Sequence, residues 1–126
     1  MKVIGVKRRP ELTSEEHKSY ADEIVGLDQL DRVVKEADYV VGVLPKHETT
    51  GDFFNMESCF SKMKKSAVFM NIGRGTTVDE DHLVDALKTG KIAGAVLDVF
   101  KVEPLPKESE LWKCPNLLMT PHCADQ

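Results

Sequence analysis

The chain has 126 residues, of which 41% are hydrophobic, so it is long enough for one globular domain and too short for two of ordinary size. Its 17 basic and 21 acidic residues are spread along the chain and give a formal net charge of −4. This balance argues against a nucleic-acid partner and against binding to an anionic membrane surface.

Short apolar runs alternate with segments of helical period, which predicts β-α-β units, a parallel sheet and an α/β fold. In chain order, strands are expected at residues 2–6, 23–26, 38–44, 67–72, 92–99 and 116–120, and helices at 27–37, 55–64 and 79–90. Asp79 is the expected N-cap of the last helix, and Gly90 its end. Most of the strands are apolar throughout, which predicts one sheet of about six strands covered by helices on both faces.

The stretch Gly73-Arg74-Gly75 lies between a predicted strand and a predicted helix, as the phosphate loop of a dinucleotide-binding domain does. That loop needs a third small residue, and here the position is Val78, with a large cation in the middle of the motif. No other strand is followed by such a loop, because residues 2–6 lead directly into Lys-Arg-Arg-Pro. We therefore expect a partial Rossmann-like, doubly wound sheet whose first β-turn-α unit is missing.

Four polar residues follow successive predicted strands. Arg74 comes after the strand at 67–72, Asp98 and Glu103 after the strand at 92–99, and His122 after the strand at 116–120. Open α/β sheets bind ligands at the carboxyl ends of their strands, so these side chains are expected to converge on one site.

Residues 73–106 and 111–122 resemble the signature of the D-isomer-specific 2-hydroxyacid dehydrogenases, and the similarity is dense from about Val40 to His122. The resemblance implies that Arg74 binds the substrate carboxylate and polarises the carbonyl. It implies that His122 is the general acid or base for the substrate oxygen, that Glu103 pairs with it, and that Asp98 holds the nicotinamide carboxamide.

These residue types suit hydride transfer to a 2-oxo acid. Negative charge develops on the carbonyl oxygen, where a fixed cation stabilises the transition state, and a planar guanidinium grips a carboxylate with two hydrogen bonds. An imidazole can deliver a proton near neutral pH, and a neighbouring carboxylate favours its protonated form. Glyoxylate and hydroxypyruvate are the first substrates to expect on the resemblance.

The cofactor is expected to be NADP, with NAD as the alternative. Arginine after the second strand of a dinucleotide fold accommodates the 2′-phosphate. Because the first β-turn-α unit is expected to be missing, the strand at 2–6 corresponds to that second strand, and it is followed by Arg8 and Arg9 without an acidic residue. The alternative interpretation of these arginines is a solvated basic turn. By resemblance, Leu44 and Pro45 would pack against the adenine, and Thr49 would lie near the ribose or phosphates. Ile72 and Gly73 would approach the nicotinamide ribose.

Members of this family also have a separate substrate-binding domain and a glycine-rich loop before the first strand present here. We therefore expect residues 1–126 to be a partial NAD(P)-binding domain without the substrate-binding domain, with weak or no cofactor binding and no activity by itself. Two other classes stay open. One is a non-catalytic binding role like that of the related transcriptional corepressors, and the other is an assembly module whose unfinished sheet edge promotes a homodimer.

The three cysteines are odd in number and lack C-x-x-C spacing, which indicates reduced thiols and a cytoplasmic protein. Cys114, His122 and Cys123 are close in sequence, but no second pair completes a ligand set, so no metal site is predicted. No apolar run approaches the roughly 20 residues of a membrane-spanning helix, and residues 1–6 are too short for a signal peptide.

Overall fold

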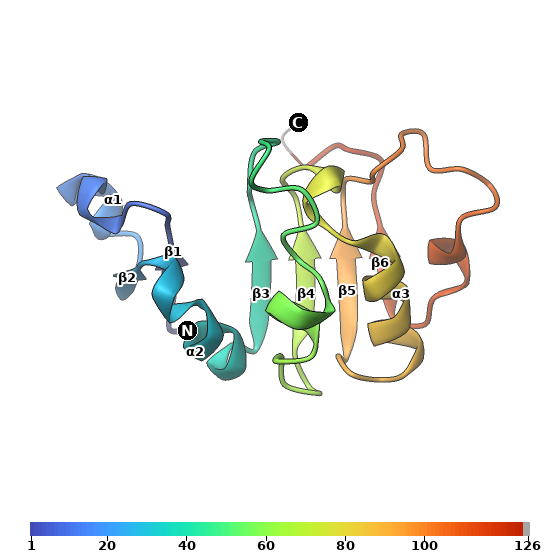
Figure 1. Ribbon diagram of the computed structural model, residues 1–126, viewed down its shortest axis with the longest axis horizontal. Coiled ribbons are helices and arrows are strands. Elements are labelled where there is room, and N and C mark those ends of the chain that lie inside the picture. Colours follow the sequence, from blue (N-terminus) through green and yellow to red (C-terminus); the bar gives the residue numbers. More distant parts are fainter. Residues whose placement is uncertain (125–126) are drawn as a thin grey trace.

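The computed structural model of the protein describes residues 1–124 and has an α/β, Rossmann-like architecture of parallel strands and flanking helices (Figure 1). All six predicted strands are present, and each is parallel to the strand it pairs with. The strands are β1 (Ile4–Val6), β2 (Glu23–Val25), β3 (Tyr39–Gly42), β4 (Val68–Asn71), β5 (Gly94–Leu97) and β6 (Leu117–Met119). The helices are α1 (Glu15–Lys18), α2 (Leu30–Glu36) and α3 (Glu80–Lys88).

The prediction of one continuous sheet is wrong for the described residues. β1 and β2 form a sheet of two strands, and β3, β4, β5 and β6 form a second sheet in that order. Figure 1 shows β1 and β3 standing apart, and side chains from β1, α2 and β3 line a hollow of about 350 Å³ between them. The apolar pattern predicts each strand, whereas the pairing depends on tertiary packing, and in the described residues β3 pairs with β4 and not with β1. Each of these two strands therefore keeps one unpaired edge.

The prediction that both sheet faces are covered is also wrong, and so is that of a buried strand at 38–44. The strand register places Val41, Met70, Val96 and Leu118 in one row across the four-stranded sheet. Val41 is 50% exposed and Leu118 is 61% exposed, so this face is open. An apolar strand residue marks a surface that can be buried, whereas its actual burial depends on which other elements pack there.

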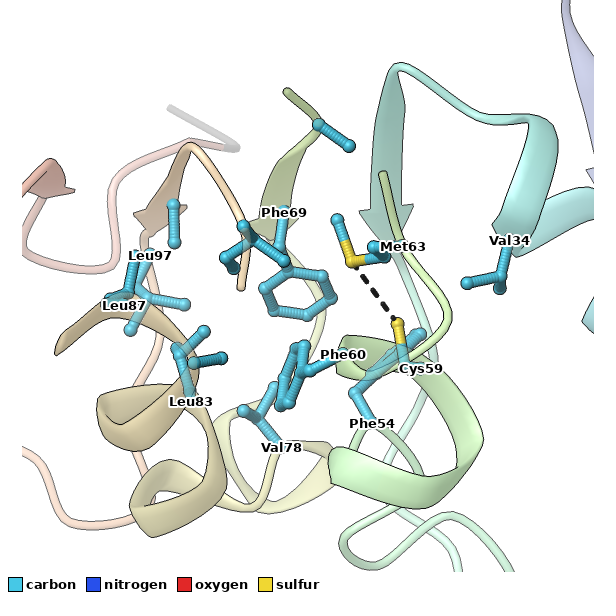
Figure 2. Packing of buried hydrophobic residues seen from close by; sticks show 14 of the residues in the cluster. Val34, Phe54, Cys59, Phe60, Met63, Phe69, Val78, Leu83, Leu87 and Leu97 are labelled. Carbon is cyan, nitrogen blue, oxygen red and sulfur yellow. Dashed lines mark hydrogen bonds between the residues drawn. The ribbon is translucent and has the colours of Figure 1, made fainter. Parts of the chain in front are cut away.

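The opposite face carries the core. Phe69 of β4 is fully buried and contacts Phe54 and Phe60, each with a ring-centroid distance of 5.2 Å. Figure 2 shows the rings of Phe60 and Phe69 between Met63 on one side and Leu83 and Leu87 of α3 on the other. The packing of α3 against this face holds β4 and β5 in place, and with them the loops that leave their carboxyl ends.

The local signals for α3 are confirmed. The Asp79 side chain accepts a hydrogen bond from the His82 backbone N–H at 3.1 Å, and Gly90 adopts a φ of +68° just after the helix. The helix predicted at 55–64 is instead a short π-helical turn, Met56–Phe60, capped by Asn55. Within residues 1–124, no helix has the length and apolar character needed to cross a membrane.

Candidate functional site

The four predicted polar residues lie at the carboxyl ends of three neighbouring strands. Arg74 follows β4, Asp98 directly follows β5 with Glu103 in the same loop, and His122 follows β6. Arg74, Glu103 and His122 line one hollow of about 180 Å³. The other residues that line it are Lys46, Gly75, Thr76, Val99, Phe100 and Lys101.

Two glycines allow the Arg74 loop to sit between its neighbours. A Cβ atom on Gly75 would lie 1.9 Å from the carbonyl carbon of Phe100, in the loop after β5. A Cβ atom on Gly73 would lie 2.8 Å from the carbonyl oxygen of Leu44, in the loop after β3. Both approaches are too close for any side chain, so the glycines that flank Arg74 serve backbone packing between three adjacent loops. The phosphate-cradle interpretation is unnecessary for either of them.

Glu103 and His122 form a hydrogen-bonded pair. The Glu103 Oε2 lies 2.8 Å from the His122 Nδ1, and the other carboxylate oxygen accepts the Phe100 backbone N–H at 2.9 Å. The hydrogen bond to Glu103, followed by its negative charge, raises the pKa of His122 above 6.5. The same hydrogen bond lowers the pKa of Glu103 below 4.5. Because Glu103 occupies Nδ1, Nε2 is the ring nitrogen that can reach a substrate oxygen.

Asp98 anchors the segment that carries His122. It is 2% exposed, and its Oδ1 accepts hydrogen bonds from the Thr120 hydroxyl and, at 2.9 Å, from the Cys123 backbone N–H. Its Oδ2 accepts the Ala124 backbone N–H at 2.9 Å. These hydrogen bonds, led by that from Thr120, lower the pKa of Asp98 to about 2. Asp98 is therefore ionised and is hydrogen-bonded to residues on both sides of His122.

His122 needs this support because its φ is +54°, a left-handed conformation that is uncommon for a residue with a side chain. Asp98 is not among the residues that line the hollow with Arg74. Its contact with a nicotinamide carboxamide stays a prediction, and the structure adds a clear local role in holding His122.

The predicted cofactor residues are spread more widely. Leu44 and Gly73 are in backbone contact, and Ile72 is 44% exposed at the end of β4. Pro45 and Thr49 are exposed, and the Thr49 hydroxyl lies 3.0 Å from the His47 Nδ1. Arg8 and Arg9 are exposed after β1 and are not part of the hollow.

Sequence reasoning missed Lys46 and Lys101, which line the hollow beside Arg74. Their positions shortly after predicted strands were the available signal, because β3 and β5 end at the same edge as β4. Lys101 is also tied to its surroundings, since its Nζ lies 2.6 Å from Asp52 and its backbone N–H donates to Glu80 at 2.7 Å. Over residues 1–124, no group of three or more His, Cys, Asp or Glu side chains is placed to hold a metal ion.

Comparison with known proteins identifies the domain type. Residues 1–124 match the model of the "D-isomer specific 2-hydroxyacid dehydrogenase, NAD binding domain". The chain is 53% identical over 93 residues to a "Probable 2-ketogluconate reductase" of Dictyostelium discoideum. It is 50% identical over 93 residues to a "Glyoxylate/hydroxypyruvate reductase B" of Escherichia fergusonii. Each match covers 74% of this chain and 28% of the relative, so the chain spans under a third of either protein.

A solved structure supports the same conclusion. The fold superimposes with a TM-score of 0.84 on the D-isomer specific 2-hydroxyacid dehydrogenase of Xanthobacter autotrophicus in complex with NADPH and MES. The two sequences are 38% identical, and the match covers 97% of this chain and 48% of that one.

We predict that Glu103→Gln will lower the pKa of His122 toward 6.5, because a neutral amide no longer stabilises the imidazolium. NMR titration of the His122 ring measures this directly. Glu108→Gln, which removes an equal charge from an exposed residue nearby, should leave the His122 titration unchanged. Identical titration curves for His122 in the original protein and in Glu103→Gln would contradict the assignment of the pair.

The same pair sets a pH window for its contribution to stability. Because the pKa of His122 is raised in the folded protein, protonated His122 stabilises the fold fully below about pH 6.5, and this stabilisation is lost as the pH rises through the raised pKa. Because the pKa of Glu103 is lowered in the folded protein, the Glu103 carboxylate stabilises the fold fully above about pH 4.5, and this stabilisation is lost as the pH falls through the lowered pKa. The stabilisation that Glu103→Gln removes should therefore be largest between these two limits.

Proposed function

The chain belongs to the D-isomer specific 2-hydroxyacid dehydrogenase family. We propose that it forms the nucleotide-binding side of an active site, in an enzyme that reduces small 2-oxo acids with NADPH. The observation that carries this proposal is the Glu103–His122 pair, at 2.8 Å, on the same hollow as Arg74. We propose glyoxylate and hydroxypyruvate as substrates, since the E. fergusonii relative is named for both compounds. We also propose that the protein acts in the cytoplasm, where its three free cysteines would stay reduced.

In this proposal, Arg74 binds the substrate carboxylate and polarises the carbonyl, and its guanidinium stabilises the negative charge that develops on the carbonyl oxygen. Protonated His122 donates a proton from Nε2 to that oxygen. Glu103 holds the imidazole through Nδ1 and favours its protonated form before the transfer. Asp98 keeps the backbone around His122 in place. A bound nicotinamide would supply the hydride.

The cofactor is proposed to lie along the carboxyl ends of β3 and β4. Ile72 offers an exposed apolar side chain there, and Gly73 lets the backbone after β4 pack closely against Leu44 after β3. Leu44 and Pro45 would face the adenine, Thr49 the ribose or phosphates, and Asp98 the nicotinamide carboxamide. Residues 1–124 match the NAD binding domain of the family; in this proposal, closure of the cleft would depend on a substrate-binding domain, and residues 1–126 by themselves would be inactive.

We predict that Arg74→Lys in the full-length enzyme will reduce kcat/KM for glyoxylate by roughly 10²–10³-fold, the usual cost of removing one donor that stabilises the transition-state oxyanion. Lysine keeps the charge but cannot form the two parallel hydrogen bonds of a guanidinium. Steady-state kinetics with NADPH test this. Arg32→Lys is the matched control, because Arg32 pairs with Glu23 on the two-stranded sheet. Equal losses in the two variants would refute the assignment of Arg74.

The preference for NADPH is proposed to come from Arg8 and Arg9. Replacing both with alanine should weaken NADPH binding by roughly tenfold or more, because a hydrogen bond to a charged group is worth about 1.5–3 kcal/mol. NADH, which lacks the 2′-phosphate, should bind as before. Fluorescence titration of the full-length enzyme with each cofactor measures the ratio. Lys91→Ala removes an exposed charge elsewhere and should change neither affinity; an unchanged ratio in the arginine variant would count against the proposal.

A second candidate function, assembly into a homodimer, is favoured by the open face of the four-stranded sheet. Tyr39, Val41 and Leu118 are each at least half exposed, and β3 has an unpaired edge within residues 1–124. Association through these residues would bury apolar surface that the described part of the chain leaves in water.

We predict that light scattering will give a mass near twice 14.1 kDa for the chain, and that Leu118→Lys will return it to 14.1 kDa. A charge at this position would have to be buried without a partner in the dimer. Tyr20→Lys, at a 66% exposed position in the two-stranded part, should leave the mass unchanged. A monomer at all concentrations of the original chain would exclude this candidate.

A further inference from the structure

Asn71 is a fully buried polar residue at the carboxyl end of β4, and its side chain serves the Arg74 loop. Its Oδ1 accepts the Gly73 backbone N–H at 3.1 Å, and its Nδ2 donates to the Arg74 carbonyl at 3.1 Å. This orientation of the amide satisfies both partners, whereas the flipped orientation would satisfy neither. Asn71 therefore bridges the two residues that determine where the arginine leaves the sheet.

Thr77 completes the support from the other side of the loop. It is fully buried, its hydroxyl donates to the Arg74 carbonyl at 2.7 Å, and its backbone N–H donates to the same oxygen at 3.1 Å. The Arg74 carbonyl thus receives hydrogen bonds from residues on both sides of it in sequence. Few positions of this oxygen allow all of these bonds at once, so the loop is held in one conformation.

The arginine side chain leaves the Cα next to this fixed carbonyl and is itself folded against the loop. Its Nη1 donates to the Gly73 carbonyl at 2.7 Å, while Gly75 is pressed against Phe100. A long side chain normally loses much rotamer freedom when it is ordered. Here the ordering is provided by the protein before a ligand arrives, which is the condition for efficient recognition of a carboxylate.

We infer that Asn71 and Thr77 are positioning residues that set the location of the Arg74 guanidinium for the substrate carboxylate. This inference rests on the proposed function of Arg74 and adds to it the parts of the loop on which substrate binding depends. Neither residue lines the hollow, so both act through Arg74. The buried Thr77 hydroxyl and Asn71 amide therefore fix the geometry of the site and also stabilise the fold.

The test uses three variants of the supporting residues and one control variant in the full-length enzyme. Thr77→Val removes the hydroxyl and keeps the shape, whereas Thr77→Ser keeps the hydroxyl. Asn71→Asp keeps an oxygen for the Gly73 N–H but places a second acceptor against the Arg74 carbonyl. Thr89→Val is the matched control, because the Thr89 hydroxyl also donates to a backbone carbonyl, that of Asp85 at the end of α3, away from the hollow.

Thr77→Val and Asn71→Asp are expected to lower kcat/KM for glyoxylate by up to about 10²-fold, the size of effect that a misplaced binding group produces. Inhibition by oxamate, a small carboxylate that cannot be reduced, should weaken in parallel, while the Kd for NADPH stays within about twofold. Thr77→Ser should restore oxamate binding, and Thr89→Val should match the original enzyme. If oxamate binding is unchanged in Thr77→Val, or weakens only in proportion to NADPH binding, the residues are merely structural and the inference is wrong.

A readout that does not need turnover separates this inference from the proposed function. NMR relaxation of the Arg74 backbone amide should show increased motion in Thr77→Val and original behaviour in Thr77→Ser. A rigid Arg74 in Thr77→Val would overturn the positioning role whether or not the enzyme reduces glyoxylate. If the original enzyme reduces no 2-oxo acid while Arg74 gains motion, the proposed function fails and the hydrogen-bonded support of the loop stands.

Discussion

The arrangement of the site depends on the close approach of three backbone segments at the carboxyl ends of β3, β4 and β5. Gly73 touches the backbone of Leu44, and Gly75 touches that of Phe100 at a distance no Cβ atom could tolerate. Arg74 stands between these two contacts, so its backbone cannot shift without moving a neighbouring loop. The core beneath, centred on Phe69 and closed by α3, holds the strands at the spacing that makes this contact possible.

The charged groups of the site divide into those that hold the chain and those that face the hollow. Asp98 is buried and ionised and accepts three hydrogen bonds from the segment around His122, whose φ is left-handed. Glu103 is partly exposed and acts on the His122 ring, raising its pKa. The two carboxylates thus have different environments and different tasks: one fixes the position of the imidazole, and the other favours its protonated state.

The four-stranded sheet carries this site on a framework that is covered on one face only. Its other face presents Val41 and Leu118 to solvent, and in the described part of the chain β3 has a free edge toward the two-stranded sheet. The hydrogen bonds that define the site lie at the carboxyl end of β4 and among the loops that follow β4, β5 and β6. Their geometry therefore depends on the covered face and on loop packing, and much less on the part of the chain that contains β1 and β2.

The sequence by itself determined the six strands, the helix α3 and the neighbourhood of the site. Apolar runs predicted all six strands, the capping residue Asp79 and the terminating Gly90 predicted α3, and the rule that ligands bind at strand ends predicted that Arg74 and His122 would lie together. These signals are local, or follow from the strand order of a parallel sheet, and they can be recognised in a single chain.

Only the tertiary structure decided which surfaces meet. The separation into two sheets, the open face, the grip of Asp98 on the residues around His122 and the support of Arg74 by Asn71 and Thr77 all depend on packing and hydrogen bonds. The glycines that flank Arg74 resemble a phosphate loop in sequence, because close packing of backbone segments and close approach of a phosphate both require a residue without a side chain. What approaches each glycine, Leu44 in one case and Phe100 in the other, is known only when the strands are placed side by side.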